Sequence, residues 1–186
     1  MAQEVVDRDE ELDRLELEIG DLCFDILARA QPTASDVRFI TTASKTVADI
    51  ERIGKNGVNI ARRALEIVHE PELKPVIDIP VAAAAAQRIL RESVDAFVNE
   101  DAGLANRVIA SHSYINAVCE QMLRALLTYM LEDPSTTSRA LRLIFVARNL
   151  ERVGDYAANI AEMALLLVEG QDVAPRSRSA HRNLGG

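Results

Sequence analysis

The chain repeats part of itself at an offset of 100 residues. Residues 51–68 read ERIGKNGVNIARRALEIV, residues 151–168 read ERVGDYAANIAEMALLLV, and nine of these eighteen positions are identical. Two helices of similar composition would share alanine and leucine, but not Glu-Arg-x-Gly followed at the same distance by Asn-Ile-Ala. Such self-similarity indicates two copies of one supersecondary unit. We therefore expect two related halves, each ending in one of these segments.

Apolar residues recur at intervals of three to four positions over most of the chain, a spacing typical of amphipathic helices. Prolines interrupt this pattern at position 32, within residues 71–80 and at position 134. Thr33 or Ser35 is suited to cap the helix that follows the first break, and Asp101 is suited to cap the fourth helix. Gly170 is expected to end the last helix. We predict an all-α fold with helices over residues 4–30, 35–69, 81–99 and 101–132, and a fifth from the turn at residues 133–135 to residue 168.

The repeat and the helix breaks divide the chain into four segments. We assign residues 1–70 to a first repeat of two helices, residues 71–80 to a linker and residues 81–170 to a second repeat of three helices. Residues 171–186 combine Ser, Arg, Gly and Pro without apolar periodicity, which is typical of a disordered tail. Because the first repeat has one helix fewer, we expect it to expose an apolar face that a partner helix or a second copy covers.

The composition is that of an acidic, folded protein. The 186 residues are 48% hydrophobic and carry a formal net charge of −8, whereas a nucleic-acid-binding surface needs a basic face. The apolar runs are too short to span a membrane, and the acidic N-terminus has no export signal. Cys23 and Cys119 are far apart, as in proteins of a reducing compartment. We therefore expect a cytoplasmic protein without nucleic-acid binding or membrane insertion.

Acidic residues form a stripe on the repeated helix. Glu151, Asp155 and Asn159 are spaced four apart, so they share one face of the helix. Carboxylates at this spacing repel each other, and a hard divalent or trivalent cation with a preference for oxygen ligands would offset that repulsion. The alternative is a solvated helix face without a ligand.

Antiparallel pairing around each turn predicts which residues face this stripe. A first turn centred near residue 32 brings Glu51 and Lys55 opposite Asp13 and Asp9. A second turn near residues 133–134 brings the second set together: His112, Asn116, Glu151 and Asp155. Each set offers oxygen or nitrogen ligands for a cation. In the first set, Asp9 with Lys55 has a simpler interpretation as a surface ion pair.

No catalytic motif accompanies these clusters. The sequence has no nucleophile elbow, phosphate-binding glycine loop, dinucleotide fingerprint or Cys/His zinc spacing. Glu66 and His69 form a single Glu-x-x-His, whereas di-iron bundles need two copies, so we interpret it as accidental. Nothing combines a nucleophile with a base and an orienting group. We therefore predict that the protein is not an enzyme.

Four stretches of the chain carry a specific combination of residues. They are QPTASD at residues 31–36, SKT at residues 44–46 leading into ERIG at residues 51–54, LTYMLED at residues 127–133 and ARNLERVGD at residues 147–155. Together they resemble the PhoU family of phosphate-transport accessory and signalling proteins. The resemblance covers nearly the whole chain up to Gln171. It implies a fold of two tandem three-helix bundles, with the first bundle here reduced to a helix hairpin.

The resemblance also implies a function. PhoU proteins are cytoplasmic negative regulators that link a phosphate ABC transporter, through its ATPase, to a sensor histidine kinase, and they commonly form homodimers. They bind clusters of iron or another metal through Glu/Asp-x-x-x-Asp motifs. The positions of this chain that match those motifs are Asp9, Asp13, Glu51, Glu151 and Asp155. Lys55, His112 and Asn116 stand where the family pattern has acids.

Two other functions remain open at this point. One is a helical metal-binding protein that stores iron or takes part in redox chemistry. The other is a structural adaptor in which the acidic motif has no present use.

Overall fold

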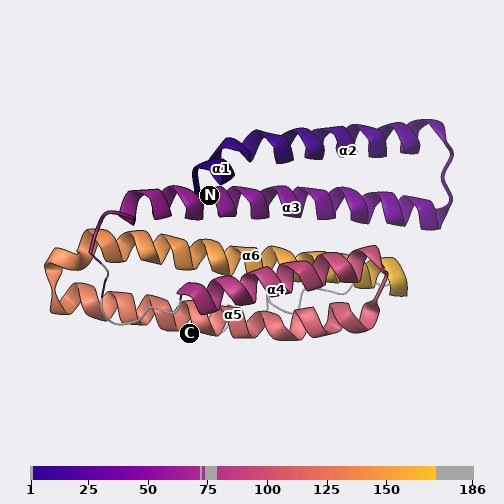
Figure 1. Ribbon diagram of the computed structural model, residues 1–186. Coiled ribbons are helices and arrows are strands. Elements are labelled where there is room, and N and C mark those ends of the chain that lie inside the picture. Colours follow the sequence, from indigo (N-terminus) through magenta and orange to yellow (C-terminus); the bar gives the residue numbers. More distant parts are fainter. Residues whose placement is uncertain (1, 72, 74–78, 171–186) are drawn as a thin grey trace, which may run out of the picture.

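The computed structural model describes residues 2–71, 73 and 79–170, and every element in them is a helix (Figure 1). The elements are α1 (Ala2–Asp7), α2 (Asp9–Arg29), α3 (Ala34–Ile67), α4 (Ile79–Val98), α5 (Ala102–Glu132), the 3-10 helix η1 (Pro134–Thr136) and α6 (Thr137–Glu169). The predicted all-α class is confirmed, and α3 to α6 agree with the predicted ranges to within two residues. Much of the predicted linker (72 and 74–78) and the whole predicted tail (171–186) lie outside the described residues.

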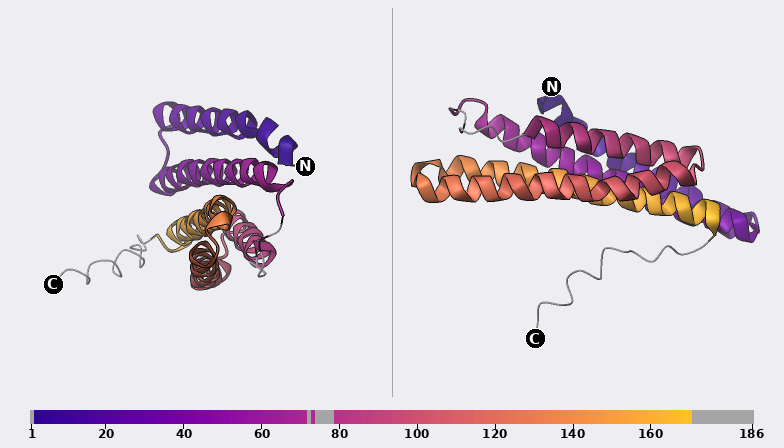
Figure 2. Two further views of the ribbon diagram at one scale, coloured as in Figure 1. Left: turned by 90° about the vertical axis from the view of Figure 1, so that its left-hand side faces the viewer. Right: turned by 90° about the horizontal axis from the view of Figure 1, so that it is seen from below.

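The helices form two layers that meet along one contact. Helices α2 and α3 run as an antiparallel pair, and α4, α5 and α6 form a three-helix bundle beside them (Figures 1 and 2). The pair meets the bundle through α3, which packs along α6, whereas α2 contacts only α1 and α3 among the described helices. None of the helices in the described parts of the chain combines the length and the apolar character that a bilayer crossing requires.

The first predicted helix is divided in two. We expected one helix over residues 4–30, but Arg8 has φ −96° and ψ 5°, and its side chain makes no capping hydrogen bond. The next three residues, Asp9, Glu10 and Glu11, occupy the first turn of α2. Three carboxylates there interact favourably with the partial positive charge of a helix N-terminus, which favours a helix start at this point. Apolar spacing alone does not reveal such a break.

Short polar side chains determine where the other helices begin and end. Thr33 caps α3, because its hydroxyl accepts a hydrogen bond from the amide of Asp36 while Asp36 accepts one from the amide of Thr33. The Thr33 hydroxyl also donates a hydrogen bond to Asp36 Oδ2 at 2.6 Å, and this bond, together with the one from the Thr33 amide, lowers the pKa of Asp36. Asp101 caps α5 through the amide of Leu104 at 2.8 Å. Gly170 ends α6 with φ 68°, a left-handed conformation that glycine adopts without strain.

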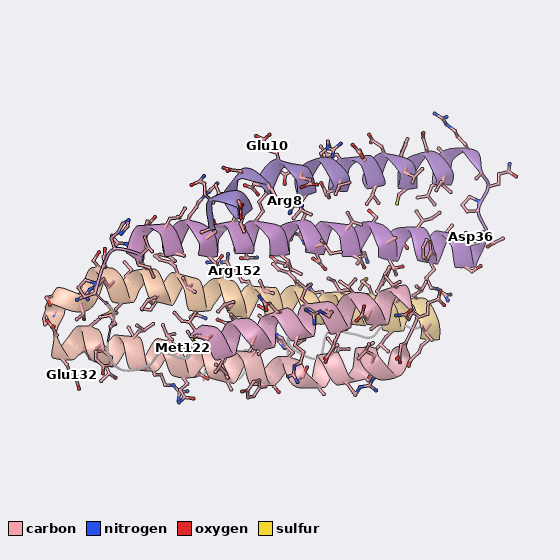
Figure 3. All side chains as sticks on the ribbon, viewed as in Figure 1. Arg8, Glu10, Asp36, Met122, Glu132 and Arg152 are labelled. Carbon is pink, nitrogen blue, oxygen red and sulfur yellow. The ribbon has the colours of Figure 1, made fainter. Side chains whose placement is uncertain are left out.

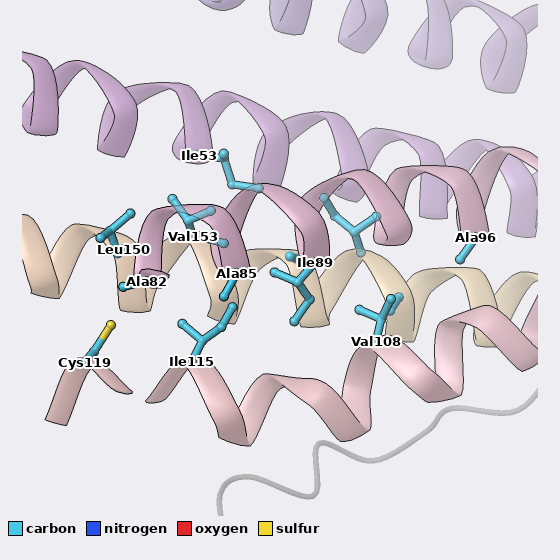
Figure 4. Packing of buried hydrophobic residues seen from close by; sticks show 14 of the residues in the cluster. Ile53, Ala82, Ala85, Ile89, Ala96, Val108, Ile115, Cys119, Leu150 and Val153 are labelled. Carbon is cyan, nitrogen blue, oxygen red and sulfur yellow. The ribbon is translucent and has the colours of Figure 1, made fainter. Parts of the chain in front are cut away.

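The apolar core lies inside the three-helix bundle (Figure 4). Ile89 of α4, Ile115 of α5 and Ile160 of α6 are almost fully buried there, and each such side chain stabilises the fold by roughly 1.5–3 kcal/mol. Helix α3 adds Ile53 from outside the bundle (Figure 4). The core therefore links the two layers.

Helix α2 contributes no buried residue. Phe24 is 72% exposed and Leu17 is 66% exposed, and further apolar side chains of α2 are also accessible: Leu15, Leu22, Ile26 and Leu27. In the bundle, α4 packs on both α5 and α6. Among the described helices, only the short helix α1 contacts both α2 and α3. Self-association through this apolar surface stays a prediction.

The glycine of the repeated motif lies at a close helix–helix approach in both hairpins. A Cβ added to Gly154 of α6 would lie 3.3 Å from the buried side chain of Ile115 on α5. A Cβ added to Gly54 of α3 would lie 2.2 Å from Leu12 on α2. The repeat at an offset of 100 thus corresponds to matching contacts in space, and it is the missing side chain that lets each helix pair approach.

We predict that Gly154→Leu destabilises the protein. The new side chain has to displace Ile115, and overpacking of a core costs about 1–3 kcal/mol. Gly20 is the control, because no heavy atom lies within 4 Å of its added Cβ. Gly20→Leu is expected to raise the free energy of unfolding by up to about 1 kcal/mol through helix propensity. Urea unfolding measures both variants, and equal effects would contradict a close approach at Gly154.

Candidate functional site

The first acidic cluster joins α2 to α3 around one lysine. The Lys55 Nζ lies 2.7 Å from Asp13 Oδ2, 3.2 Å from Asp9 Oδ1 and 3.8 Å from Glu51 Oε1. These are the residues that antiparallel pairing around Pro32 brought together, so the predicted proximity is confirmed. The surface ion pair between Asp9 and Lys55 is also present, as part of a network of three carboxylates.

The charges in this cluster influence one another. The hydrogen bonds that Lys55 donates to Asp13 and Asp9 raise its pKa, because they favour the ammonium form. Burial raises the pKa of Glu51, and the negative charges of Asp13 and Glu16 add to this effect, while Lys55 opposes it. The lysine is therefore held as a cation among carboxylates, one of which is harder to ionise than usual.

The second cluster joins α5 to α6 with different chemistry. The Nε2 of His112 lies 2.7 Å from Asp155 Oδ1, and the side-chain amide of Asn116 lies 3.4 Å from the same nitrogen. Glu151 is directed elsewhere, since its Oε2 accepts a hydrogen bond from Arg148 Nη1 at 2.7 Å. The predicted proximity of His112 and Asp155 is confirmed. Arg148 was missed, although its position three residues before Glu151 allows such a pair.

A small cavity of about 260 Å³ lies beside this cluster, lined in part by Asn116, Cys119, Arg148 and Glu151. Burial, together with the negative charge of Glu151, raises the pKa of the Cys119 thiol to about 11. The thiol is therefore protonated at neutral pH and is a poor nucleophile. Cys119 is a core residue, with 2% of its surface exposed.

The two clusters share one unusual feature. Asp13 Oδ1 and Asn116 Oδ1 are buried and have no hydrogen-bond partner in the described part of the chain. Asp13 of α2 lies near Glu51 of α3, and Asn116 of α5 lines the same cavity as Glu151 of α6, so the two oxygens lie near corresponding glutamates of the repeat. Buried oxygens without a partner are costly, and they usually meet a water or an ion.

A metal cluster of the kind that the resemblance implies does not fit this arrangement of side chains. In the described residues, no group of three or more His, Cys, Asp or Glu side chains has the geometry of a metal site. Lys55 supplies a positive charge to the first cluster, and Arg148 engages Glu151 at the second. A cation would have to displace these groups. Metal binding by Asp9, Asp13, Glu51, Glu151 and Asp155 stays a prediction, and we derive no chemical step from it.

Both halves of the chain match one family model. The model describes a PhoU domain, and it matches residues 1–64 and 79–164, which contain both clusters. The chain belongs to the PhoU family. The resemblance predicted from the four sequence stretches is thereby confirmed.

Individual PhoU proteins are similar over most of the chain. The phosphate-specific transport system accessory protein PhoU homolog of Pseudomonas aeruginosa is 41% identical over 174 residues, which are 93% of this chain and 72% of that protein. The accessory protein PhoU of Escherichia coli is 34% identical over 92% of this chain and 71% of its own length.

Solved PhoU structures have the same fold. The crystal structure of PhoU from Pseudomonas aeruginosa superposes with a TM-score of 0.88 at 40% identity, covering 91% of this chain and 82% of that one. The phosphate transport system regulatory protein PhoU from Streptococcus pneumoniae superposes with a TM-score of 0.85 over 94% of this chain and 82% of that one. At 23% identity, the latter supports the fold alone.

We predict that Lys55→Asp creates a cation site in the first cluster. The change replaces the ammonium with a carboxylate among Asp9, Asp13 and Glu51, and the resulting repulsion favours a hard cation such as Mn²⁺. At 100 times its Kd, Mn²⁺ would stabilise the variant by about 2.7 kcal/mol. Isothermal titration calorimetry and thermal unfolding measure this effect.

Lys45→Asp is the matched control, because Lys45 is exposed on the same helix and has no ion pair among the described residues. Equal Mn²⁺ binding by the two variants would refute the assigned role of Lys55.

We also predict that Glu51→Gln stabilises the protein at neutral pH. Because the pKa of Glu51 is raised in the folded state, its ionised form costs stability above that pKa, and this cost disappears at lower pH as the carboxylate protonates. The gain in melting temperature should therefore be largest near pH 7 and shrink as the pH falls towards the ordinary glutamate pKa. Glu18→Gln, on the exposed side of α2, is expected to change little; a gain that persists at low pH would contradict this account.

Proposed function

We propose that this protein is a non-enzymatic negative regulator of phosphate uptake and phosphate-starvation signalling. It would act by contact with the ATPase of a phosphate ABC transporter and with a sensor histidine kinase. The observation that carries this proposal is the match of the PhoU model to both halves of the chain. The relatives named above are phosphate-specific transport system accessory proteins, which supports the pathway.

The chemistry of the two clusters is consistent with contact rather than catalysis. Their polar and charged groups are engaged with one another: Lys55 pairs with Asp13, and His112 shares a hydrogen bond with Asp155. Asp155 remains 51% exposed at its side chain and Glu151 remains 28% exposed. Partly exposed carboxylates held in fixed positions can recognise basic groups of a partner, and they contribute more to specificity than to affinity.

A second candidate is a metal-dependent role, either as assistance to the regulator or as iron storage or redox chemistry. The observation that favours it is the pair of buried oxygens of Asp13 and Asn116, neither of which has a hydrogen-bond partner among the described residues. Elemental analysis of the purified protein separates the candidates. Several equivalents of iron, bound reversibly and with redox activity, would favour storage or redox chemistry over regulation by contact.

Deletion of the gene tests the regulatory function. We expect a phosphate-starvation reporter to become active in phosphate-rich medium, and the wild-type gene to restore repression. The double variant Glu151→Ala/Asp155→Ala should fold, as judged by circular dichroism, and should fail to restore repression. An unchanged reporter after deletion would overturn the proposal.

The double variant needs a control with the same change in charge. Glu132→Ala/Glu169→Ala removes two exposed carboxylates at helix ends, away from both clusters. This control should restore repression fully. If the first double variant also restores repression, the second cluster has no part in the function, and the adaptor interpretation of the motif gains support.

A further inference from the structure

Two grooves flank the contact between α3 and α6. The larger has a volume of about 600 Å³ and is lined by four arginines, Arg62 and Arg63 of α3 and Arg148 and Arg152 of α6. We call it the arginine groove. The smaller has a volume of about 330 Å³ and includes Lys45, Asp49, Arg52 and Glu162 in its lining. We call it the counter groove.

The repeat relates the two grooves residue by residue. Each of the seven residues that line the counter groove has its partner, at an offset of 100, in the lining of the arginine groove. The pairs are Lys45 with Phe145, Ala48 with Arg148, Asp49 with Asn149, Arg52 with Arg152, Asn159 with Asn59, Glu162 with Arg62 and Met163 with Arg63. The grooves are thus the same place in the two halves of the fold.

Their charges differ although their positions correspond. Over these paired positions, the counter groove has two cations, Lys45 and Arg52, and two acids, Asp49 and Glu162. The arginine groove has four arginines and no acid at the paired positions. Arg62, Arg63 and Arg148 correspond to residues other than arginine, so the packing of α3 on α6 does not require these three arginines, whereas Arg152 corresponds to Arg52.

Three carboxylates complete the lining of the arginine groove, and each has a side-chain partner. Glu66 lies 2.7 Å from Arg63 and also pairs with Arg142, which is outside the lining. Glu151 lies 2.7 Å from Arg148. The third carboxylate, Asp155, binds His112, also from outside the lining.

Two of the arginines keep their hydrogen-bonding capacity. Arg152, which Figure 3 labels in the region between α3 and α6, has no hydrogen bond or ion pair among the described residues. The only ionic contact of Arg62 in those residues is to Asp9, at 3.8 Å, and its side chain is 56% exposed. The two guanidinium groups come from the two helices that form the walls of the groove.

We propose that the arginine groove is a binding site for a phosphoryl anion, with Arg62 and Arg152 as its main donors. A guanidinium group presents a planar pair of N–H donors that matches two oxygens of a phosphate group. The volume exceeds the needs of one phosphate ion and suits a chain of phosphates, free or in a nucleotide. The chain has a net charge of −8 and therefore repels anions overall. The arginines of this groove create a local region that attracts an anion instead. This proposal is independent of the regulatory function proposed above.

Isothermal titration calorimetry of the full chain tests the site with three probes: orthophosphate, tripolyphosphate and ATP. We expect one molecule of tripolyphosphate to bind per chain with a submillimolar Kd, and orthophosphate to bind more weakly. Tighter binding of ATP than of tripolyphosphate would identify a nucleotide as the source of the phosphate chain. The double variant Arg62→Gln/Arg152→Gln should weaken binding by at least about tenfold, which is a loss of about 1.4 kcal/mol.

The counter groove supplies a matched control. Lys45→Gln/Arg52→Gln removes two positive charges from the counter groove and should leave the affinity unchanged. Circular dichroism and thermal unfolding confirm that each variant folds. Arg148 is left intact because it holds Glu151.

Three results would overturn the proposal. One is the absence of binding by all three probes. Another is an equal loss of affinity in both double variants, which would show a non-specific effect of net charge. The third is binding of a short polyglutamate peptide as tightly as tripolyphosphate, which would make the groove a contact for an acidic protein segment.

Discussion

The packing of α3 along α6 is the contact on which the rest of the architecture depends. It is the one large contact between the helix pair and the three-helix bundle, and it carries Ile53 into the core of the bundle. Both helices contain the repeated segment, so the contact joins two related surfaces. Each helix uses one face for this contact and another for its hairpin partner, α2 or α5. As a result, the charged clusters lie between the two helices of each hairpin, and the two grooves lie along the contact between α3 and α6.

Much of this arrangement could be predicted from the sequence because its signals are local. The prolines and Thr33 mark the helix limits, and a turn of known position fixes which residues lie opposite one another in an antiparallel hairpin. That reasoning is sufficient to bring Lys55 to Asp13 and His112 to Asp155. The charge pattern was harder to predict, because a side chain chooses among several partners within reach. Glu151 turns to Arg148 on its own helix, and only the three-dimensional packing shows this choice. The packing of α3 on α6 also was not predictable, since both helices have apolar residues on more than one face.

The two halves have kept the same contacts but have acquired different charges. Gly54 and Gly154 give close approach in both hairpins, whereas Lys55 and Asp155 occupy the same motif position with opposite charge. The pattern extends to the contact between α3 and α6, where Glu162 corresponds to Arg62. Apolar contacts and glycines tolerate little change because interiors are closely packed. Charged positions at the surface tolerate much more, so it is there that two copies of one unit can take on separate roles within a single chain.

Helix α2 is attached so weakly that it detaches more easily than the helices of the three-helix bundle. This helix has no buried residue, and its contacts in the described chain are with α1 and α3 alone. The free energy needed to detach it is therefore smaller than that needed to separate α6 from the bundle, where Ile160 and its neighbours are enclosed. Amide hydrogens of α2 will exchange with solvent when this helix detaches locally, whereas those of α6 will exchange only through global unfolding. The helix pair, which carries the cluster around Lys55, is thus the layer whose conformation a binding partner can change at the smallest cost in free energy.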